Sequence, residues 1–257
     1  MSQSSKLAVD AMGGDHAPDA IIAGLDIAAE RHPQAQFLIF GDEARLRPVL
    51  AKCKRLAGRY ELRHAAEVIT GDMKPTVALR LRDSSLRRAI DSVLAGEAEG
   101  VISAGNTGAL LALSKIVLKT LKGIDRPAMA AIAPSAKGDV VMLDLGLNVV
   151  YDARNLVEFA LMGTVFARIV LGLPTPTFGL LNIGSEEGKG DETLRAASNT
   201  LRESPIAGQF YGFVEGHDIA AGTVDVVVTD GFTGNVALKT GEGALKLVGD
   251  PVSYTHL

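Results

Sequence analysis

The chain has 257 residues, of which 47% are hydrophobic and 22% charged, and this composition is sufficient to bury a substantial core. Its formal net charge of −4 argues against nucleic acid as a partner, because nucleic-acid phosphates attract proteins with an excess of Lys and Arg. Cys53 is the only cysteine, which excludes an internal disulfide and leaves no cysteine cluster for a metal. We therefore expect a protein of the reducing cytoplasm that uses no metal and no cofactor.

Short apolar runs alternate along the chain with longer segments whose apolar residues recur at helical spacing. In chain order, the runs predict strands at 7–9, 37–40, 60–62, 101–102, 128–133, 140–143, 178–181 and 224–228. The periodic segments predict helices at 20–31, 43–57, 77–95, 109–121, 156–171, 193–202 and 234–248. This alternation predicts an α/β fold with a mostly parallel sheet covered by helices on both faces. No long linker divides the chain, so we expect one domain, with a second lobe within residues 50–95 as the alternative.

The first polar glycine loop, DAMGGDHAP, follows the first expected strand directly. In parallel sheets, ligands bind beyond the carboxyl ends of the strands, so this loop is a candidate site. Gly13 and Gly14 permit a close backbone turn, and Asp10, Asp15 and His16 add polar groups to it. Glycine turns after strands are also common for purely structural reasons, and the pair alone is a weak signal.

A second loop, SAGNTGALLA, lies between the expected strand at 101–102 and the helix after it. Gly105 allows backbone N–H groups to approach a ligand, and the start of the helix at Asn106 and Thr107 favours an anion. The alternative is that Asn106 and Thr107 only cap the helix. Both functions are compatible in one loop.

Two further loops repeat the arrangement of strand, polar glycine turn and helix. LDLGLN carries Asp144 and Asn148, and TDGFTGNVALK carries Asp230, Thr233 and Asn235. These side chains are candidates for binding substrate or phosphate, and equally for holding the loop backbone or capping a helix. Several such loops at successive strand ends are a stronger indication of a site than any one of them.

Lys189 lies between two glycines in the stretch LLNIGSEEGKGDE, after the strand expected at 178–181. A lysine in this setting is exposed and able to reach an anion. Most exposed lysines have no specific role, so the position alone does not establish one.

The order of these motifs is specific. DAMGGDHAP, SAGNTGA, LNIGSEEGKG and DGFTGNVALK together resemble the signature stretches of the bacterial phosphate acyltransferase family. The resemblance implies a three-layer α/β/α sandwich related to isopropylmalate dehydrogenases and phosphotransacetylases, and a homodimer. It implies transfer of a long-chain fatty acyl group from an acyl carrier protein thioester to inorganic phosphate, which gives acyl phosphate for bacterial phospholipid synthesis.

That reaction assigns roles to three residues. Attack by anionic phosphate on a carbonyl requires fixed N–H donors and a cation more than it requires a base. Lys189 is the candidate cation, Asn106 a candidate amide donor, and His16 a candidate donor or proton shuttle. The alternatives are a phosphotransacetylase-like enzyme acting on short acyl-CoA, a dehydrogenase of the isopropylmalate type, and a non-catalytic membrane-associated scaffold for lipid enzymes.

The last eight residues, DPVSYTHL at 250–257, match nothing that the resemblance leads us to expect. We interpret 1–249 as a phosphate acyltransferase domain that is incomplete at its C-terminus, and 250–257 as a non-native tail. The resemblance further implies peripheral association with the inner face of the membrane, through amphipathic helices of the missing segment.

Overall fold

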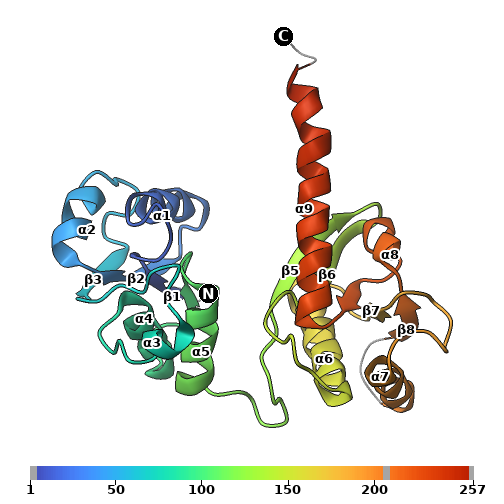
Figure 1. Cartoon of the computed structure of the whole chain (residues 1–257). Helices are drawn as coiled ribbons and strands as arrows, with labels where there is room; N and C mark the ends of the chain where they lie inside the picture. The colour runs from blue at the N-terminus through green and yellow to red at the C-terminus, as the bar shows by residue number, and fades with distance from the viewer. Residues whose placement is uncertain (1–4, 205–208, 255–257) are drawn as a thin grey trace. The chain divides into compact units, whose positions relative to one another are not determined.

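The computed structural model describes residues 5–204 and 209–254. The chain divides into two compact units, Met1–Leu121 and Lys122–Leu257, and each contains its own sheet (Figure 1). Whether the two units work together as the one domain that we expect over 1–249 stays a prediction.

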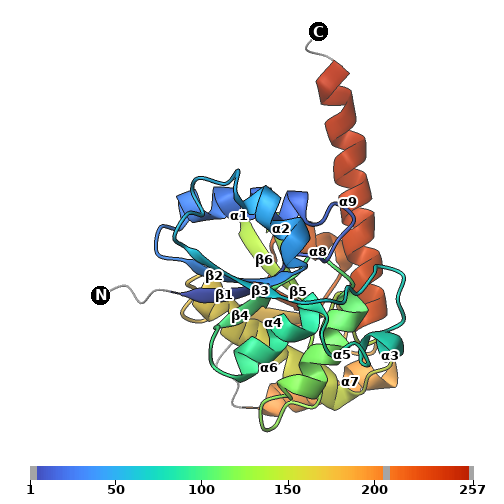
Figure 2. The ribbon, with the colours of Figure 1, turned by 90° about the vertical axis from the view of Figure 1, so that its left-hand side faces the viewer.

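The first unit contains a four-stranded parallel sheet in the order β3-β2-β1-β4. Its strands are β1 (Lys6–Asp10), β2 (Gln36–Gly41), β3 (Tyr60–His64) and β4 (Gly100–Ile102). Its helices are α1 (Asp19–Arg31), α2 (Glu43–Leu50), α3 (Pro75–Ala78), α4 (Ser85–Leu94) and α5 (Thr107–Val117). Figure 2 shows α1 and α2 on one face of the sheet and α4 on the other.

Alternation of side chains along the strands explains these two layers. Val9 and Ile39 belong to the cluster that contains Ile22 of α1. Their neighbours Ala8 and Leu38 face the opposite way and pack with the helix α4. Both faces of this sheet are therefore buried, as continuous apolar strands predict.

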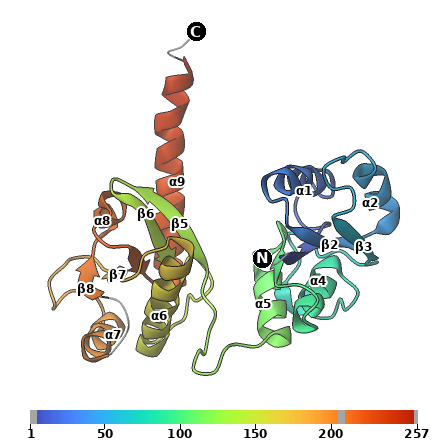
Figure 3. The same cartoon turned by 180° about the vertical axis from the view of Figure 1, so that it is seen from behind.

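The second unit contains a five-stranded sheet in the order β5-β6-β9-β7-β8, in which only the pair β5 and β6 is antiparallel (Figure 3). Its strands are β5 (Ala130–Ser135), β6 (Gly138–Leu143), β7 (Thr177–Leu181), β8 (Gln209–Val214) and β9 (Val226–Val228). Its helices are α6 (Ala153–Val170), α7 (Glu192–Glu203), α8 (Gly216–Ala221) and α9 (Gly231–Tyr254).

Here too the strands bury both faces. One cluster joins Leu143, Phe178 and Val228 to Phe159 of α6, while a second cluster on the other face contains Val227 and contacts of α8 and α9. The expected mostly parallel α/β fold with helices on both faces is confirmed. Within the described residues, none of the helices is both long and apolar enough to cross a membrane.

Three details differ from the sequence prediction. The helix expected at 43–57 ends at Leu50, because the Asp26 carboxylate accepts hydrogen bonds from the backbone N–H groups of Arg55 and Leu56 and holds that segment in turns. The helix expected at 77–95 is two helices, α3 and α4. The strand β8 and the short helix α8 were not predicted.

Candidate functional site

Asp10 ends β1 and is almost fully buried, with 3% of its surface exposed. Its Oδ1 atom accepts hydrogen bonds from Ser85 Oγ at 2.6 Å and from the backbone N–H of Met12 at 3.2 Å. Its Oδ2 atom accepts one from Ser103 Oγ at 2.8 Å. Asp10 therefore joins three segments at the carboxyl edge of the first sheet, and both of its oxygens are used within the protein.

The glycines of the first two loops allow the loops to touch. A Cβ atom on Gly13 would overlap Asp10 Oδ2 and lie 3.0 Å from the backbone nitrogen of Gly105. Gly14 has φ of +104°, a conformation that side chains disfavour. The expected close approach of backbone at Gly13, Gly14 and Gly105 is present, and it brings the DAMGGDHAP and SAGNTGALLA loops together.

The amide of Asn106 is engaged at both ends. Its Oδ1 atom caps α5 by accepting from the N–H of Ala109 at 3.0 Å. Its Nδ2 atom lies within hydrogen-bond distance of three carbonyl oxygens, the nearest being that of Met73 at 2.8 Å. Asn106 thus holds the segment around Met73 against the start of α5, and its role as a catalytic donor stays a prediction.

Asp15, His16 and Thr107 are exposed on the same loops. No hydrogen bond or ion pair of these three side chains to another described residue is present. They remain accessible to a ligand, and their predicted roles stay predictions.

In the second unit, Asp144 follows β6 and is fully buried. Its Oδ2 atom accepts from the backbone nitrogen and from Nδ2 of Asn148, at 2.6 and 2.8 Å, and its Oδ1 atom accepts from the N–H of Met129 at 2.9 Å. Asn148 Nδ2 also donates to the carbonyl of Pro127 at 2.9 Å. These contacts make Asp144 and Asn148 the internal support of their loop.

The first turn of α9, which follows β9 after Asp230, packs directly on that loop. A Cβ atom on Gly234 would overlap the carbonyl oxygen of Asp144, and Asn235 Nδ2 donates to the carbonyl of Leu145 at 3.1 Å. Asp230 caps α9 by accepting from the N–H groups of Phe232 and Thr233 at 2.8 and 2.9 Å. The side chain of Thr233 is exposed.

Lys189 is exposed on the loop between β7 and α7, and its aliphatic stem lies over Gly184. It makes no ion pair with any residue that the structure describes. The end of this loop carries Asp191, which caps α7 and whose Oδ2 atom lies 3.4 Å from the hydroxyl of Tyr151. Lys189 is therefore a free cation at the carboxyl end of β7, as its position between glycines indicates.

Sequence reasoning missed Tyr151 and Asn182, which both belong to this edge of the second sheet. Burial, together with the negative charges of Asp230 and Asp191, raises the pKa of Tyr151 to about 12. Tyr151 is therefore a neutral hydrogen-bond donor at any physiological pH. Asn182, directly after β7, is buried beneath the Lys189 loop. Tyr151 leaves no local sequence signal, because Asp191 and Asp230 lie far along the chain, whereas Asn182 stands in the same stretch as Lys189.

The predicted site residues thus form two groups. The first unit brings together Asp10, Gly13, Gly14, Gly105 and Asn106 at the carboxyl edge of its sheet. The second brings together Asp144, Asn148, Asp230 and Asn235 at the ends of the adjacent strands β6 and β9, with Lys189 after β7, the next strand in the sheet. That all of them border one cavity stays a prediction.

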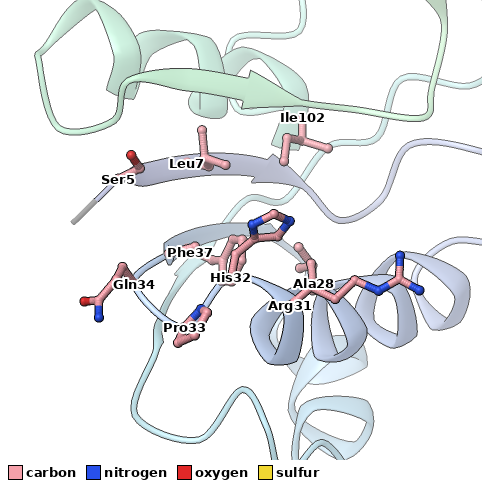
Figure 4. A pocket seen from close by; sticks show the side chains of 11 residues that line it. Ser5, Leu7, Ala28, Arg31, His32, Pro33, Gln34, Phe37 and Ile102 are labelled. Atoms are coloured by element: carbon pink, nitrogen blue, oxygen red, sulfur yellow. The ribbon is translucent and has the colours of Figure 1, made fainter. Parts of the chain in front are cut away.

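An apolar pocket of about 600 Å³ lies elsewhere in the first unit (Figure 4). Leu7, Phe37 and Ile102 contribute much of its apolar lining, and Arg31 and His32 lie at the end of α1 beside it. None of the predicted site residues lines it. Within the described part of the chain, no group of three or more His, Cys, Asp and Glu side chains is placed to hold a metal ion.

Comparison with solved structures identifies the fold. The chain superposes on the EutD phosphotransacetylase from Staphylococcus aureus with a TM-score of 0.65 and 15% identity, covering 96% of this chain and 83% of that one. It superposes on a branched-chain phosphotransacylase from Enterococcus faecalis V583 with a TM-score of 0.62 and 16% identity, covering 92% and 83%. At these identities the likeness shows the fold alone.

Comparison of sequences is more specific. The chain is 74% identical over 244 residues to a protein of Acidiphilium cryptum strain JF-5 named phosphate acyltransferase, and 69% identical over 241 residues to one of Gluconobacter oxydans strain 621H with the same name. The matches cover 95% and 94% of this chain but 64% and 65% of those relatives, so the chain spans somewhat less than two thirds of their length. The profile of the fatty acid synthesis protein family matches residues 5–252, and the chain therefore belongs to that family.

Proposed function

We propose that the protein transfers a long-chain fatty acyl group from the thioester of acyl carrier protein to inorganic phosphate, giving an acyl phosphate for phospholipid synthesis. The observation that carries the proposal is the 74% identity to a relative named phosphate acyltransferase. The glycine loops at the strand ends and the unpaired Lys189 support it, because they are the parts that such a reaction needs.

In the proposed reaction, a phosphate oxygen forms a bond to the carbonyl carbon and the carbon–sulfur bond breaks. The electron pair leaves with the sulfur, which takes up a proton to become the carrier thiol. Lys189 would offset the repulsion between the anionic phosphate and the developing oxyanion. Backbone N–H groups of the glycine loops at the strand ends would orient the phosphate.

Inorganic phosphate and acyl carrier protein are the proposed partners, and a second copy of the chain is proposed to complete a homodimer. The apolar side chains exposed on α9, Leu245 at 65%, Leu247 at 74% and Val248 at 68%, support an additional partner for this helix. We propose that the protein works in the cytoplasm, with peripheral association at the inner face of the membrane.

The test is to incubate the protein with palmitoyl acyl carrier protein and phosphate and to trap acyl phosphate with hydroxylamine. Acyl hydroxamate that depends on both substrates supports the proposal. Parallel reactions distinguish the alternatives: acetyl-CoA with phosphate tests a phosphotransacetylase-like enzyme, and NAD reduction tests a dehydrogenase. Binding of partner enzymes without turnover of any of these substrates would favour the scaffold.

A further inference from the structure

Asn182 holds a buried hydrogen-bond donor that no residue in the described part of the chain satisfies. The residue follows β7 directly and is only 9% exposed. Among the side chains that the structure describes, its Nδ2 atom is the buried nitrogen or oxygen that has no hydrogen-bond partner. Burying such a donor without a partner destabilises the folded state, so proteins seldom retain one without a use.

The orientation of this amide is fixed by its other end. Oδ1 accepts a hydrogen bond from the backbone N–H of Ile183 at 2.8 Å. Turning the amide over would place its NH₂ group against that N–H, donor against donor, so Nδ2 must be the end that lacks a partner.

The loop that carries Lys189 is shaped around the same amide. Gly190 has φ of +81°, and a Cβ atom there would lie 2.6 Å from Asn182 Oδ1 and 3.0 Å from Nδ2. Only glycine lets the loop close over Asn182 in this way. The unsatisfied donor therefore lies beneath the segment that presents Lys189.

The local charge indicates what kind of acceptor fits. The stretch from Asn182 to Glu192 contains four carboxylates, Glu186, Glu187, Asp191 and Glu192, against one lysine. The neighbouring Arg195 donates to the carbonyl of Gly190 at 2.6 Å. In this acidic setting, a neutral carbonyl oxygen is a better acceptor for the neutral Nδ2 donor than a further anionic oxygen.

We propose that Asn182 Nδ2 donates a hydrogen bond to the carbonyl oxygen of the acyl thioester, an inference that rests on the proposed function. As phosphate attacks the carbonyl carbon, negative charge grows on this oxygen, and the fixed amide stabilises it until the carbon–sulfur bond breaks. Asn182 is then a catalytic residue that acts on the acyl donor and not on phosphate.

Asn182→Asp and Asn182→Ala test the assignment, because both remove the Nδ2 donor. The first keeps an oxygen that can accept from the Ile183 N–H, and the second adds no charge. We expect both to lower kcat by about 10²-fold or more, as loss of an oxyanion donor does, with the KM for phosphate changed by less than about threefold. Asn199→Asp, which adds the same charge at an exposed position of α7, is the matched control and should keep wild-type kcat.

A second measurement needs no variant to be active. The chain contains six asparagines, so labelling them with ¹⁵N gives six pairs of side-chain NH₂ signals by NMR, one pair for each residue. Adding palmitoyl acyl carrier protein without phosphate should shift one pair that unacylated carrier protein leaves in place, and that pair should be missing in Asn182→Asp.

Retention of kcat within about threefold in folded Asn182→Ala, or no acyl-dependent shift of that pair, would overturn the assignment while leaving the proposed function intact. An inactive wild-type protein would instead overturn the proposed function itself, and this inference with it.

Discussion

The hydroxyl of Ser85 donates a hydrogen bond of 2.6 Å to Asp10, a residue 75 positions earlier in the chain. Ser103 donates to the other oxygen of the same carboxylate. One buried side chain thus fixes the relative positions of the first glycine loop, the start of α4 and the end of β4. Ser85 and Asp10 are held in place by each other.

Asp10→Asn should destabilise the protein by about 1–3 kcal/mol, because the NH₂ group would face a hydroxyl or N–H donor and leave it buried without an acceptor. The urea midpoint should fall accordingly. Asp15→Asn is the control, since that carboxyl is exposed on the same loop and has no partner among the described residues. Equal midpoints for the two variants would show that the Asp10 contacts contribute nothing.

Gly234→Ala should also be destabilising, by about 1–3 kcal/mol, because its Cβ would overlap the carbonyl oxygen of Asp144 and force the two loops apart. Gly241→Ala in the same helix should instead stabilise the protein. Nothing lies within 4 Å of its Cβ, so the better helix former should add up to about 1 kcal/mol. Thermal melts compare the pair, and a fall in both midpoints would contradict the packing argument.

The sequence predicted strands well because buried strands are continuous apolar runs, but it failed at 77–95. Val77 and Leu81 lie four residues apart, as do Leu86 and Ile90 of α4, yet the chain leaves the helix after Ala78. The carboxylate of Asp83 accepts from the N–H of Ala66 at 3.1 Å, and Ser84 caps α4. The contact between Asp83 and Ala66 joins residues 17 positions apart, so local periodicity cannot reveal it.

In the candidate site, too, the sequence reveals some features and not others. Glycines such as Gly13 and Gly14 are recognisable because tight turns after strands require that residue type. Sequence could not separate a carboxylate that is available to a ligand from one that is used internally. Both oxygens of Asp144 already accept hydrogen bonds, from the N–H groups of Asn148 and Met129. The burial of the Asn182 amide, in contrast, depends on how Gly190 closes over it.

Lys189→Ala should remove most acyltransferase activity and leave the melting temperature nearly unchanged, because an exposed side chain over Gly184 has little packing to lose. Lys189→Arg should restore only part of the rate, since the guanidinium is larger and planar. Lys137→Ala, an exposed lysine at the turn between β5 and β6, is the control. Wild-type turnover by Lys189→Ala would eliminate the proposed cation.

The last prediction concerns the phenol of Tyr151. In the folded protein, one of the four tyrosines should ionise near pH 12 while unfolded tyrosine ionises near 10, and Tyr151→Phe should remove that late phase from the phenolate absorbance titration. Burial is the largest cause of the shift, and the charges of Asp230 and Asp191 add to it. Asp191→Asn keeps a good helix cap but removes one charge, so it should lower the pKa of Tyr151.

The same shift predicts how stability changes with pH. A group whose pKa is raised by folding stabilises the folded state fully below its unfolded pKa, and this contribution is lost as pH rises through the folded value. Wild-type stability should therefore fall between about pH 10 and 12 by more than that of Tyr151→Phe, while the two proteins follow parallel curves at lower pH. Urea midpoints at a series of pH values make the comparison. Parallel curves across the whole range would mean that folding does not raise the pKa of Tyr151.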